Sequence, residues 1–306
     1  MSAHRRSATV AALAGLATTL ALAAPRAAAD PVTVGVYAPS MPFDGTAARL
    51  ELASKLAAHL AGADGVGRVY GKASDFAAAL ARGEIQLAVV DAAFLAASGV
   101  AHTDLAVAVR GGDAAVAWQL VARAPIAGVL DLRGKTVVAP VAAPADFVDN
   151  AMLGGELPVG FFKVEASPDV LSAVAAVDLG KADAAVVPGG IALPAGVVRI
   201  AALPSVSWPV LIAARGAPAD VVTRARDRAP SFAGSGAIAG FRAGGADGYQ
   251  ALARRLRRAV RRAPMLLPNL RITVGALIEG RAFTIATPPL ASYLPPPPAP
   301  PPPPGE

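Results

Sequence analysis

The stretch ASDFAAALARGEIQLAVVDAAF, residues 73–94, contains the pattern that decides the fold. Ala and Leu at helical spacing fill residues 73–84, and Ser74 or Asp75 can cap the start of that helix. A continuous apolar run follows at 85–94 and ends its strand at Asp91. A helix that leads into a wholly apolar strand is typical of a sheet with both faces covered.

The residues before this stretch show the same alternation. A β-branched run at 32–38 predicts a strand, leucines at 46–63 predict an amphipathic helix, and 67–71 predict a short strand. The order β-α-β-α-β predicts a mostly parallel sheet with helices on both faces.

A second α/β unit of similar plan follows. Strand-like residues at 117–125 precede VLDLRGKTVVAP, residues 129–140, which leads through a glycine turn into another apolar strand. Residues 132–153 predict a strand that runs through a Pro/Ala loop into a helix. Further elements are predicted at 168–182 (helix), 183–189 (strand), 217–232 (helix) and 248–260 (helix). The predicted fold class is therefore α/β, with two βαβ-type lobes.

The first 29 residues have the pattern of an export signal. Positive residues at 4–6 precede an apolar Ala/Leu run at 8–24, and small residues lead up to Asp30. We expect 1–29 to be a signal peptide and the mature chain to begin near Asp30. The alternative is a retained membrane anchor, for which the run is short and Ala-rich.

The chain contains no cysteine, so a disulfide framework, a thiolate metal site and a lipid-modified N-terminal cysteine are excluded. His59 and His102 have no metal-ligand spacing, and each is interpreted as a surface or hydrogen-bonded histidine. Neither a G-x-S-x-G motif nor a histidine beside a nucleophile is visible. We expect no enzymatic activity, no metal and no cofactor.

The formal charge of +6 falls to about +3 once Arg5, Arg6 and Arg26 leave with the signal, so nucleic acid is not an expected partner. The segment RRLRRAVRR, residues 254–262, places six arginines on one helix. It is either a solvated helix face or a surface for an anionic partner such as a membrane. Residues 289–306, PLASYLPPPPAPPPPPGE, predict a disordered tail in the extended polyproline II conformation.

Four segments, in this order, resemble the phosphate/phosphonate-type periplasmic solute-binding proteins, which have the type 2 periplasmic-binding fold. They are VTVGVYAPSMP (32–42), ALARGEIQLAVVDAAF (79–94), LVARAPIAGVLDLRGKTVVAP (120–140) and AAVDLGKADAAVVPG (175–189). The resemblance covers roughly residues 32–262.

This resemblance implies two lobes joined by two crossover segments, which close on a small molecule and dock on an ABC-type permease. Lobe 1 would comprise 30–118 and 208–288, and lobe 2 would comprise 119–207, with crossovers near 117–121 and 206–211. It also implies a periplasmic location, and we expect a monomer.

The ligand-facing positions that the resemblance implies are Tyr37, Ser40, Met41, Asp91, Pro140, Asp146 and Trp208. Trp208 is interpreted either as a cover for the ligand or as a hinge-packing core residue. Phosphate- and phosphonate-binding relatives place Ser and Thr hydroxyls at the strand-to-helix junction. Here residues 141–145 are VAAPA, followed by Asp146, which is either a ligand contact or an ordinary first-turn acid.

We found no arginine or lysine after the junction strand that could neutralise a phosphate, so tight phosphate binding is not expected. A neutral, zwitterionic or cationic ligand fits these residues better. The alternative function is a periplasmic interaction or scaffold protein that keeps the fold without solute transport, with the arginine helix and proline tail as its working surfaces.

Overall fold

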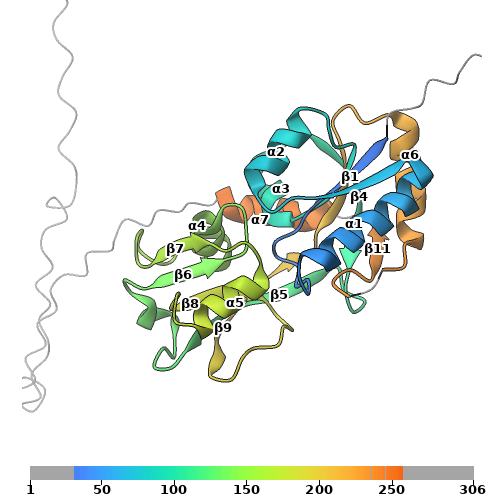
Figure 1. The fold of residues 1–306 in the computed structure, drawn as a ribbon. Coiled ribbons are helices and arrows are strands. Elements are labelled where there is room, and N and C mark those ends of the chain that lie inside the picture. The colour runs from blue at the N-terminus through green and yellow to red at the C-terminus, as the bar shows by residue number, and fades with distance from the viewer. Residues whose placement is uncertain (1–30, 235, 245, 258–306) are drawn as a thin grey trace, which may run out of the picture. The chain divides into compact units, whose positions relative to one another are not determined.

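The computed structural model describes residues 31–234, 236–244 and 246–257. Three predicted segments lie outside the described residues: the signal peptide expected at 1–29, the end of the expected basic helix at 258–262, and the expected disordered tail at 289–306. Figure 1 shows two α/β lobes, each built on its own sheet. The predicted α/β fold class with two lobes is confirmed.

The sheet of lobe 1 has the strand order β11-β4-β10-β3-β1-β2. Its strands are β1 (Val32–Tyr37), β2 (Gly65–Val69), β3 (Leu87–Val90), β4 (His102–Val109), β10 (Val210–Ala214) and β11 (Gly240–Ala243). Strand β1 pairs in parallel with β2 and β3, whereas the β3/β10, β10/β4 and β4/β11 pairs are antiparallel. The expected mostly parallel sheet is therefore wrong for its outer half, because β10 returns from lobe 2 in the opposite direction.

The sheet of lobe 2 has the order β7-β6-β8-β5-β9. Its strands are β5 (Ala115–Arg123), β6 (Thr136–Ala139), β7 (Lys163–Ala166), β8 (Ala184–Pro188) and β9 (Val197–Ser207). Strand β6 is parallel to β7 and β8, and β5 is antiparallel to β8 and β9.

Helices cover both faces of each sheet. The helices are α1 (Thr46–Ala61), α2 (Ala73–Ala81), α3 (Ala92–Ser98) and α6 (Ala219–Arg228) in lobe 1; α4 (Pro144–Asp146), a π-helical turn (Phe147–Met152) and α5 (Val170–Asp178) in lobe 2; and α7 (Ala246–Arg257). Short 3-10 turns are formed by Gly62–Asp64, Val129–Leu132 and Ala229–Ser231. None of the helices in the described part of the chain has both the length and the apolarity needed to cross a bilayer.

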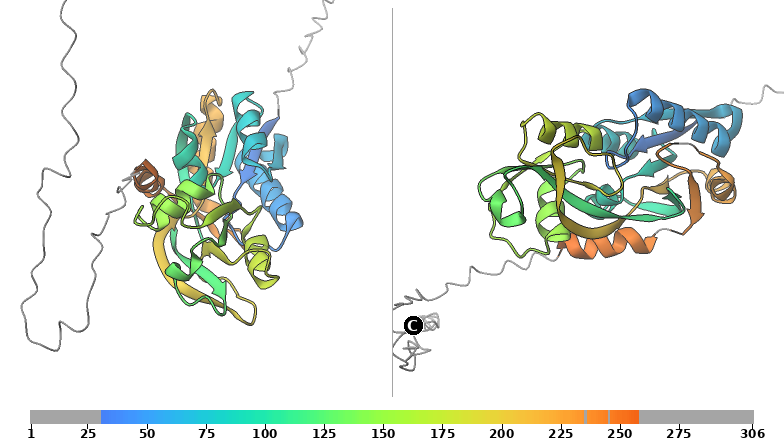
Figure 2. Two further views of the ribbon diagram at one scale, coloured as in Figure 1. Left: turned by 90° about the vertical axis from the view of Figure 1, so that its left-hand side faces the viewer. Right: turned by 90° about the horizontal axis from the view of Figure 1, so that it is seen from below.

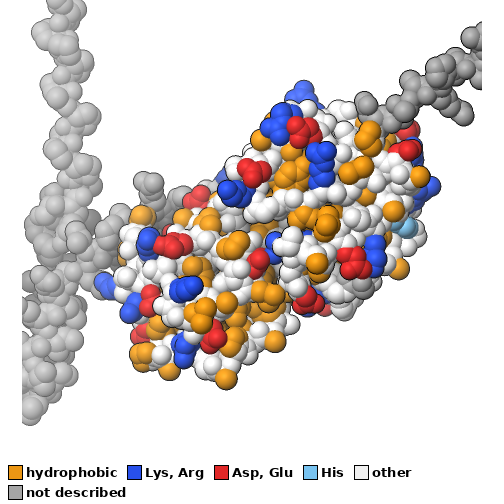
Figure 3. All heavy atoms as spheres, in the orientation of Figure 1, with side chains coloured by type: hydrophobic (Ala, Val, Ile, Leu, Met, Phe, Trp, Pro, Cys, Tyr) orange, Lys and Arg blue, Asp and Glu red, His pale blue; other side chains and the backbone are white. Residues whose placement is uncertain are grey.

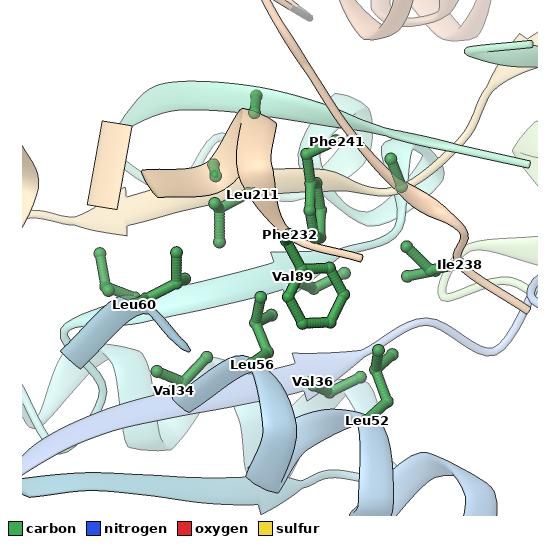
Figure 4. Packing of buried hydrophobic residues seen from close by; sticks show 14 of the residues in the cluster. Val34, Val36, Leu52, Leu56, Leu60, Val89, Leu211, Phe232, Ile238 and Phe241 are labelled. Carbon is green, nitrogen blue, oxygen red and sulfur yellow. The ribbon is translucent and has the colours of Figure 1, made fainter. Parts of the chain in front are cut away.

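The central strands are apolar throughout because they are buried from two sides. In β3, Leu87 and Val89 face the helices α1 and α6, and Ala88 and Val90 face α2 and α3. Figure 4 shows the first of these cores, in which leucines of α1 pack over β1 and β3. Alternate side chains of one strand therefore fill two cores, which is why no polar alternation is visible in the sequence.

The chain passes between the lobes at residues 110–114 and at 208–209. The two passages are joined directly, because the Trp208 N–H donates to the Ala114 carbonyl at 2.9 Å. The Ala108 N–H also donates to the Pro209 carbonyl at 2.8 Å. Strand β5 pairs in the second sheet from Ala115 onward, and the division into 30–118, 119–207 and 208–288 stays a prediction.

Candidate functional site

The two lobes are linked by an ion pair between helices that begin near their facing ends. Arg49 lies in the first turn of α1, and Asp169 is the N-cap residue of α5. The Nη2 atom of Arg49 donates to Oδ2 of Asp169 at 2.7 Å, although the residues are 120 positions apart in the sequence. Lobe 1 therefore presents a cation and lobe 2 an anion at the same point.

Asp169 is held in place by its own helix. Its Oδ1 atom accepts the Ser172 N–H at 2.7 Å, which satisfies one of the free donors at the start of α5. Burial raises the pKa of Asp169, but the N–H of Ser172 and the guanidinium of Arg49 together outweigh burial and lower it. The carboxylate is therefore ionised at neutral pH and fixed in direction.

Arg49 is nearly enclosed, with 13% of its side chain exposed. Its guanidinium lies 5.7 Å from the ring centroid of Phe43, which comes from the loop after β1. Its Nε atom is buried and has no hydrogen-bond partner among the residues that the structure describes. A buried donor without an acceptor is costly, so Arg49 retains one N–H with which to bind an additional acceptor.

Ser40 and Asp91, both predicted site residues, meet at the ends of β1 and β3. The Ser40 N–H donates to Asp91 Oδ2 at 2.9 Å, and the Ser40 hydroxyl donates to Oδ1. Burial raises the pKa of Asp91 to about 6, and the two bonds from Ser40 oppose this rise. Both residues are buried, so their polar atoms are hydrogen-bonded to each other within lobe 1.

Three other predicted residues lie in the cores. Tyr37 stacks on Phe76 with ring centroids 5.4 Å apart, and burial followed by the charge of Asp91 raises its pKa. Met41 and Trp208 belong to the core shown in Figure 4, and the Arg110 guanidinium lies 5.9 Å from the Trp208 ring. Trp208 is thus buried in the segment that passes between the lobes; its role at a hinge and the contact of these residues with a ligand stay predictions.

The junction at 140–149 lies partly against lobe 1. Pro140 is buried and Asp146 is exposed. Ala142 packs against the lobe 1 core under α2 and α3, and Ala92 and Ala93 of α3 pack into the lobe 2 core. Ala142 of the junction and the alanines of α3 therefore form apolar contacts between the lobes.

The cross-lobe pair was not predicted from the sequence, because only cations near the junction at 140–149 were considered as ligand contacts. A signal for Asp169 was present, since Ser-Pro-Asp immediately precedes an apolar helix and Asp is a favoured N-cap residue. Arg49 had no comparable signal. An arginine in the first turn of a helix is unremarkable until the other lobe is placed beside it.

Two cavities lie away from this contact. One, of 530 Å³, is in lobe 2 and is lined by residues that include Arg123, Lys135 and Asp183; the other, of 550 Å³, is in lobe 1 beside β2, Tyr70 and Arg82. Figure 3 shows acidic and basic side chains interspersed over one face of the molecule. Within the described residues, no group of three or more His, Asp or Glu side chains could hold a metal ion.

Neither a protein-family model nor a curated protein sequence matches the chain. Solved structures do match it. A binding-protein component of an ABC phosphonate transporter from Pseudomonas aeruginosa has a TM-score of 0.57 at 13% identity, over 74% of this chain and 84% of that chain. PhnD1 from Prochlorococcus marinus, in complex with methylphosphonate, has a TM-score of 0.56 at 11% identity, over 74% and 97%.

A third similar structure is the Xanthomonas citri protein XAC2383 bound to ATP, with a TM-score of 0.56 at 13% identity over 74% of this chain and 97% of that chain. At these identities the likeness establishes the fold and leaves the ligand open. The chain therefore has the two-lobe fold of these binding proteins, as the order of sequence segments predicted.

Proposed function

We propose that this protein is a periplasmic solute-binding protein that holds a small molecule between its lobes and delivers it to an ABC-type permease. The observation that supports the proposal most directly is the cross-lobe pair of Arg49 and Asp169, 2.7 Å apart. It joins the two moving parts of the fold at one point, so a solute that contacts both residues bridges the lobes.

The chemistry of the pair favours a ligand that carries both charges. A carboxylate or similar anionic group would pair with Arg49, whose buried Nε still has a donor to offer. An ammonium group would pair with Asp169, whose pKa is lowered and whose carboxylate is ionised. A purely anionic ligand would instead leave Asp169 without its cation inside a partly buried site.

The surface partners follow from the same proposal. Docking on a permease would use a face to which both lobes contribute. The protein would act as a monomer. An anionic surface could contact the basic helix through Arg254 and Arg257, which are exposed; Arg255 turns inward and donates to the Ser205 carbonyl at 3.0 Å. The remaining arginines of the segment at 254–262 lie outside the described residues.

The test is a ligand screen on the full-length exported protein by thermal shift, followed by isothermal titration of the hits. The panel contains α-amino acids and betaines, simple amines, carboxylates, phosphate and methylphosphonate. We expect a zwitterion to bind, and Arg49→Ala and Asp169→Asn each to weaken binding at least tenfold. Loss of affinity in both variants would link the ligand to both lobes.

The matched control is the exposed pair of Arg224 and Asp220 on α6, which has nearly the same geometry, 2.9 Å, within one helix. Arg224→Ala and Asp220→Asn should leave affinity unchanged. A panel without any binder would contradict the proposal and favour the fold-retaining interaction protein, and a ligand indifferent to Arg49 and Asp169 would place the site elsewhere.

A further inference from the structure

Helix α7 is attached to both lobes and to the hinge between them. It packs on α3 in lobe 1 and on the π-helical turn and β9 in lobe 2. Figure 2, right view, shows α7 in orange running from one lobe to the other. Gly248 lies against Ser207, directly before the passage at 208–209, and Leu252 is fully buried in the lobe 2 core.

A polar cluster of three residues attaches α7 to lobe 1. The Tyr249 hydroxyl donates to Asp104 Oδ2 at 2.9 Å, which connects α7 with β4. His102, also on β4, places Nε2 3.1 Å from the Tyr249 oxygen and 3.3 Å from Asp104 Oδ1. Its other nitrogen, Nδ1, lies 2.6 Å from the Val100 carbonyl.

The positions of the hydrogens in this cluster follow from its contacts. The Val100 carbonyl can only accept, so Nδ1 of His102 carries a hydrogen. The single hydrogen of the Tyr249 hydroxyl is already donated to Asp104. A neutral His102 would therefore make Nε2 and Asp104 Oδ2 compete for that one hydrogen, so that one of the two acceptors would be left without a donor. A second proton, on Nε2, removes this conflict and gives a donor to the buried Oδ1 of Asp104, which has no other donor among the described residues.

We propose that α7 is a strap across the hinge and that protonation of His102 fixes it to lobe 1. Within the described part of the chain, the titratable side chains in contact with His102 are Asp104 on β4 and Tyr249 on α7, and its register partner on β10 is Ala214. Loss of the proton leaves Asp104 Oδ1 buried without a cation and makes Nε2 an acceptor that competes with Asp104 for the Tyr249 hydrogen. Helix α7 then stays on lobe 2, where Leu252 is buried and Gly248 lies on Ser207, and no longer ties the two lobes together through this cluster.

The sign of the pH dependence follows from the same contacts. Hydrogen bonding to Asp104 raises the pKa of His102, and burial opposes this rise only in part. The attachment is therefore fully present below the ordinary histidine pKa and is lost as pH rises through the higher value of the folded protein. This inference concerns the protein without ligand and stands apart from the identity of the solute.

The test is hydrogen exchange of the full chain, read by mass spectrometry on peptides that cover 246–257 and normalised to intrinsic rates at each pH. Between pH 6 and pH 9 we expect exchange in α7 to become about tenfold faster in the unaltered protein. His102→Gln should remove this pH dependence and Tyr249→Phe should raise exchange at pH 6. His59→Gln, at a half-buried histidine of α1 that contacts the Arg228 carbonyl, should leave both unchanged.

Hinge opening is measured separately. Because the chain has no cysteine, Leu50→Cys on α1 and Leu171→Cys on α5, at positions 51% and 48% exposed, allow a pair of spin labels to report the lobe separation. The distribution of distances between the two labels should be broad at pH 9 and narrow at pH 6. A flat exchange profile in the unaltered protein would overturn the proposal, and so would a profile that persists in His102→Gln.

Discussion

Gly248 of α7 lies so close to Ser207 of β9 that a Cβ added to Gly248 would come within 2.6 Å of the Ser207 Cβ. Glycine costs a helix about 1 kcal/mol relative to alanine, so its presence inside α7 is explained by this close approach rather than by local propensity. The contact brings the helix against the second passage between the lobes. Helix α7 therefore packs closely beside this passage, and a residue larger than glycine at position 248 would push the helix away.

Gly248→Ala should lower the free energy of unfolding. Overpacking costs about 1–3 kcal/mol, and the better helix propensity of alanine recovers at most about 1 kcal/mol of it. Urea unfolding followed by circular dichroism would measure the difference. Gly71→Ala is the control, because a Cβ there meets nothing within 4 Å. Equal stability of the two variants would show that α7 does not bear on Ser207.

The ion pair of Arg49 and Asp169 should couple the two lobes energetically. A double-mutant cycle of Arg49→Ala and Asp169→Asn on the free energy of unfolding should give a coupling of about 1–3 kcal/mol, since 13% and 24% of the two side chains are exposed. The pKa of Asp169 is lowered, so its contribution is present above the ordinary carboxyl pKa and is lost as pH falls through the lower folded value.

The same cycle on Asp220 and Arg224 supplies the reference for this coupling. That pair is 2.9 Å apart within α6, with 69% of Asp220 and 37% of Arg224 exposed. Its coupling should be no more than about 0.5 kcal/mol. If the two cycles give similar small values, the cross-lobe pair stabilises the protein no more than an exposed surface pair does, and the predicted coupling of the lobes is wrong.

Much of the fold could be predicted from the sequence because strands such as β3 and helices such as α1 carry strong apolar patterns. Helix α3 could not, since its residues AAFLAAS continue the apolar run of β3 without polar periodicity. Strand β4, HTDLAVAV, was also missed, because its polar first half resembles a loop. Its pairing with β10 and β11 depends on segments that are distant in the sequence.

The site was less predictable than the fold. The meeting of Ser40 and Asp91 follows from the fold, because parallel strands place their carboxyl ends at one edge of the sheet. The pairing of Arg49 with Asp169 depends on how two lobes face each other, which no local pattern contains. The packing of Tyr37 into an aromatic core likewise follows from strand alternation, since its neighbour Val36 faces the opposite side.

Asp91 should make stability fall as pH rises. Its pKa is raised by burial to about 6, so the folded protein holds a proton there that the unfolded chain releases near pH 4. The ionised form costs on the order of 3 kcal/mol, and this cost appears between about pH 4 and pH 6. Asp91→Asn keeps an acceptor for the Ser40 N–H. Its stability relative to that of the unaltered protein should be higher at pH 7 than at pH 4.

Chemical unfolding of Asp91→Asn and the unaltered protein across this pH range isolates the effect of Asp91 from that of other carboxylates. Asp75→Asn, on the exposed start of α2, is the matched control and should show no such trend. A difference between Asp91→Asn and the unaltered protein that stays constant with pH would mean that Asp91 is ionised in the folded protein at pH 4.

Phosphate and methylphosphonate should bind only weakly, with dissociation constants in the millimolar range or above. The junction offers Ala142 and Ala143 where hydroxyls would be needed, and Ala142 is already packed against lobe 1. A dianion beside Arg49 would have to displace Asp169, which costs on the order of 1 kcal/mol or more in like-charge repulsion even with partial screening. Each charge-assisted hydrogen bond that is not formed removes about 1.5–3 kcal/mol more, whereas a helix N-terminus contributes only about 0.3–1 kcal/mol.

Isothermal titration of the full-length protein with phosphate and methylphosphonate, repeated with Asp169→Asn, measures both parts of this prediction. Removing the competing carboxylate should free Arg49 and improve phosphate affinity by about tenfold, since one ion pair no longer has to be broken. Asp220→Asn, at the exposed pair on α6, should change nothing. A micromolar constant in the unaltered protein would mean that the lobes hold phosphate at another set of donors, because Asp169 occupies the Arg49 guanidinium at 2.7 Å.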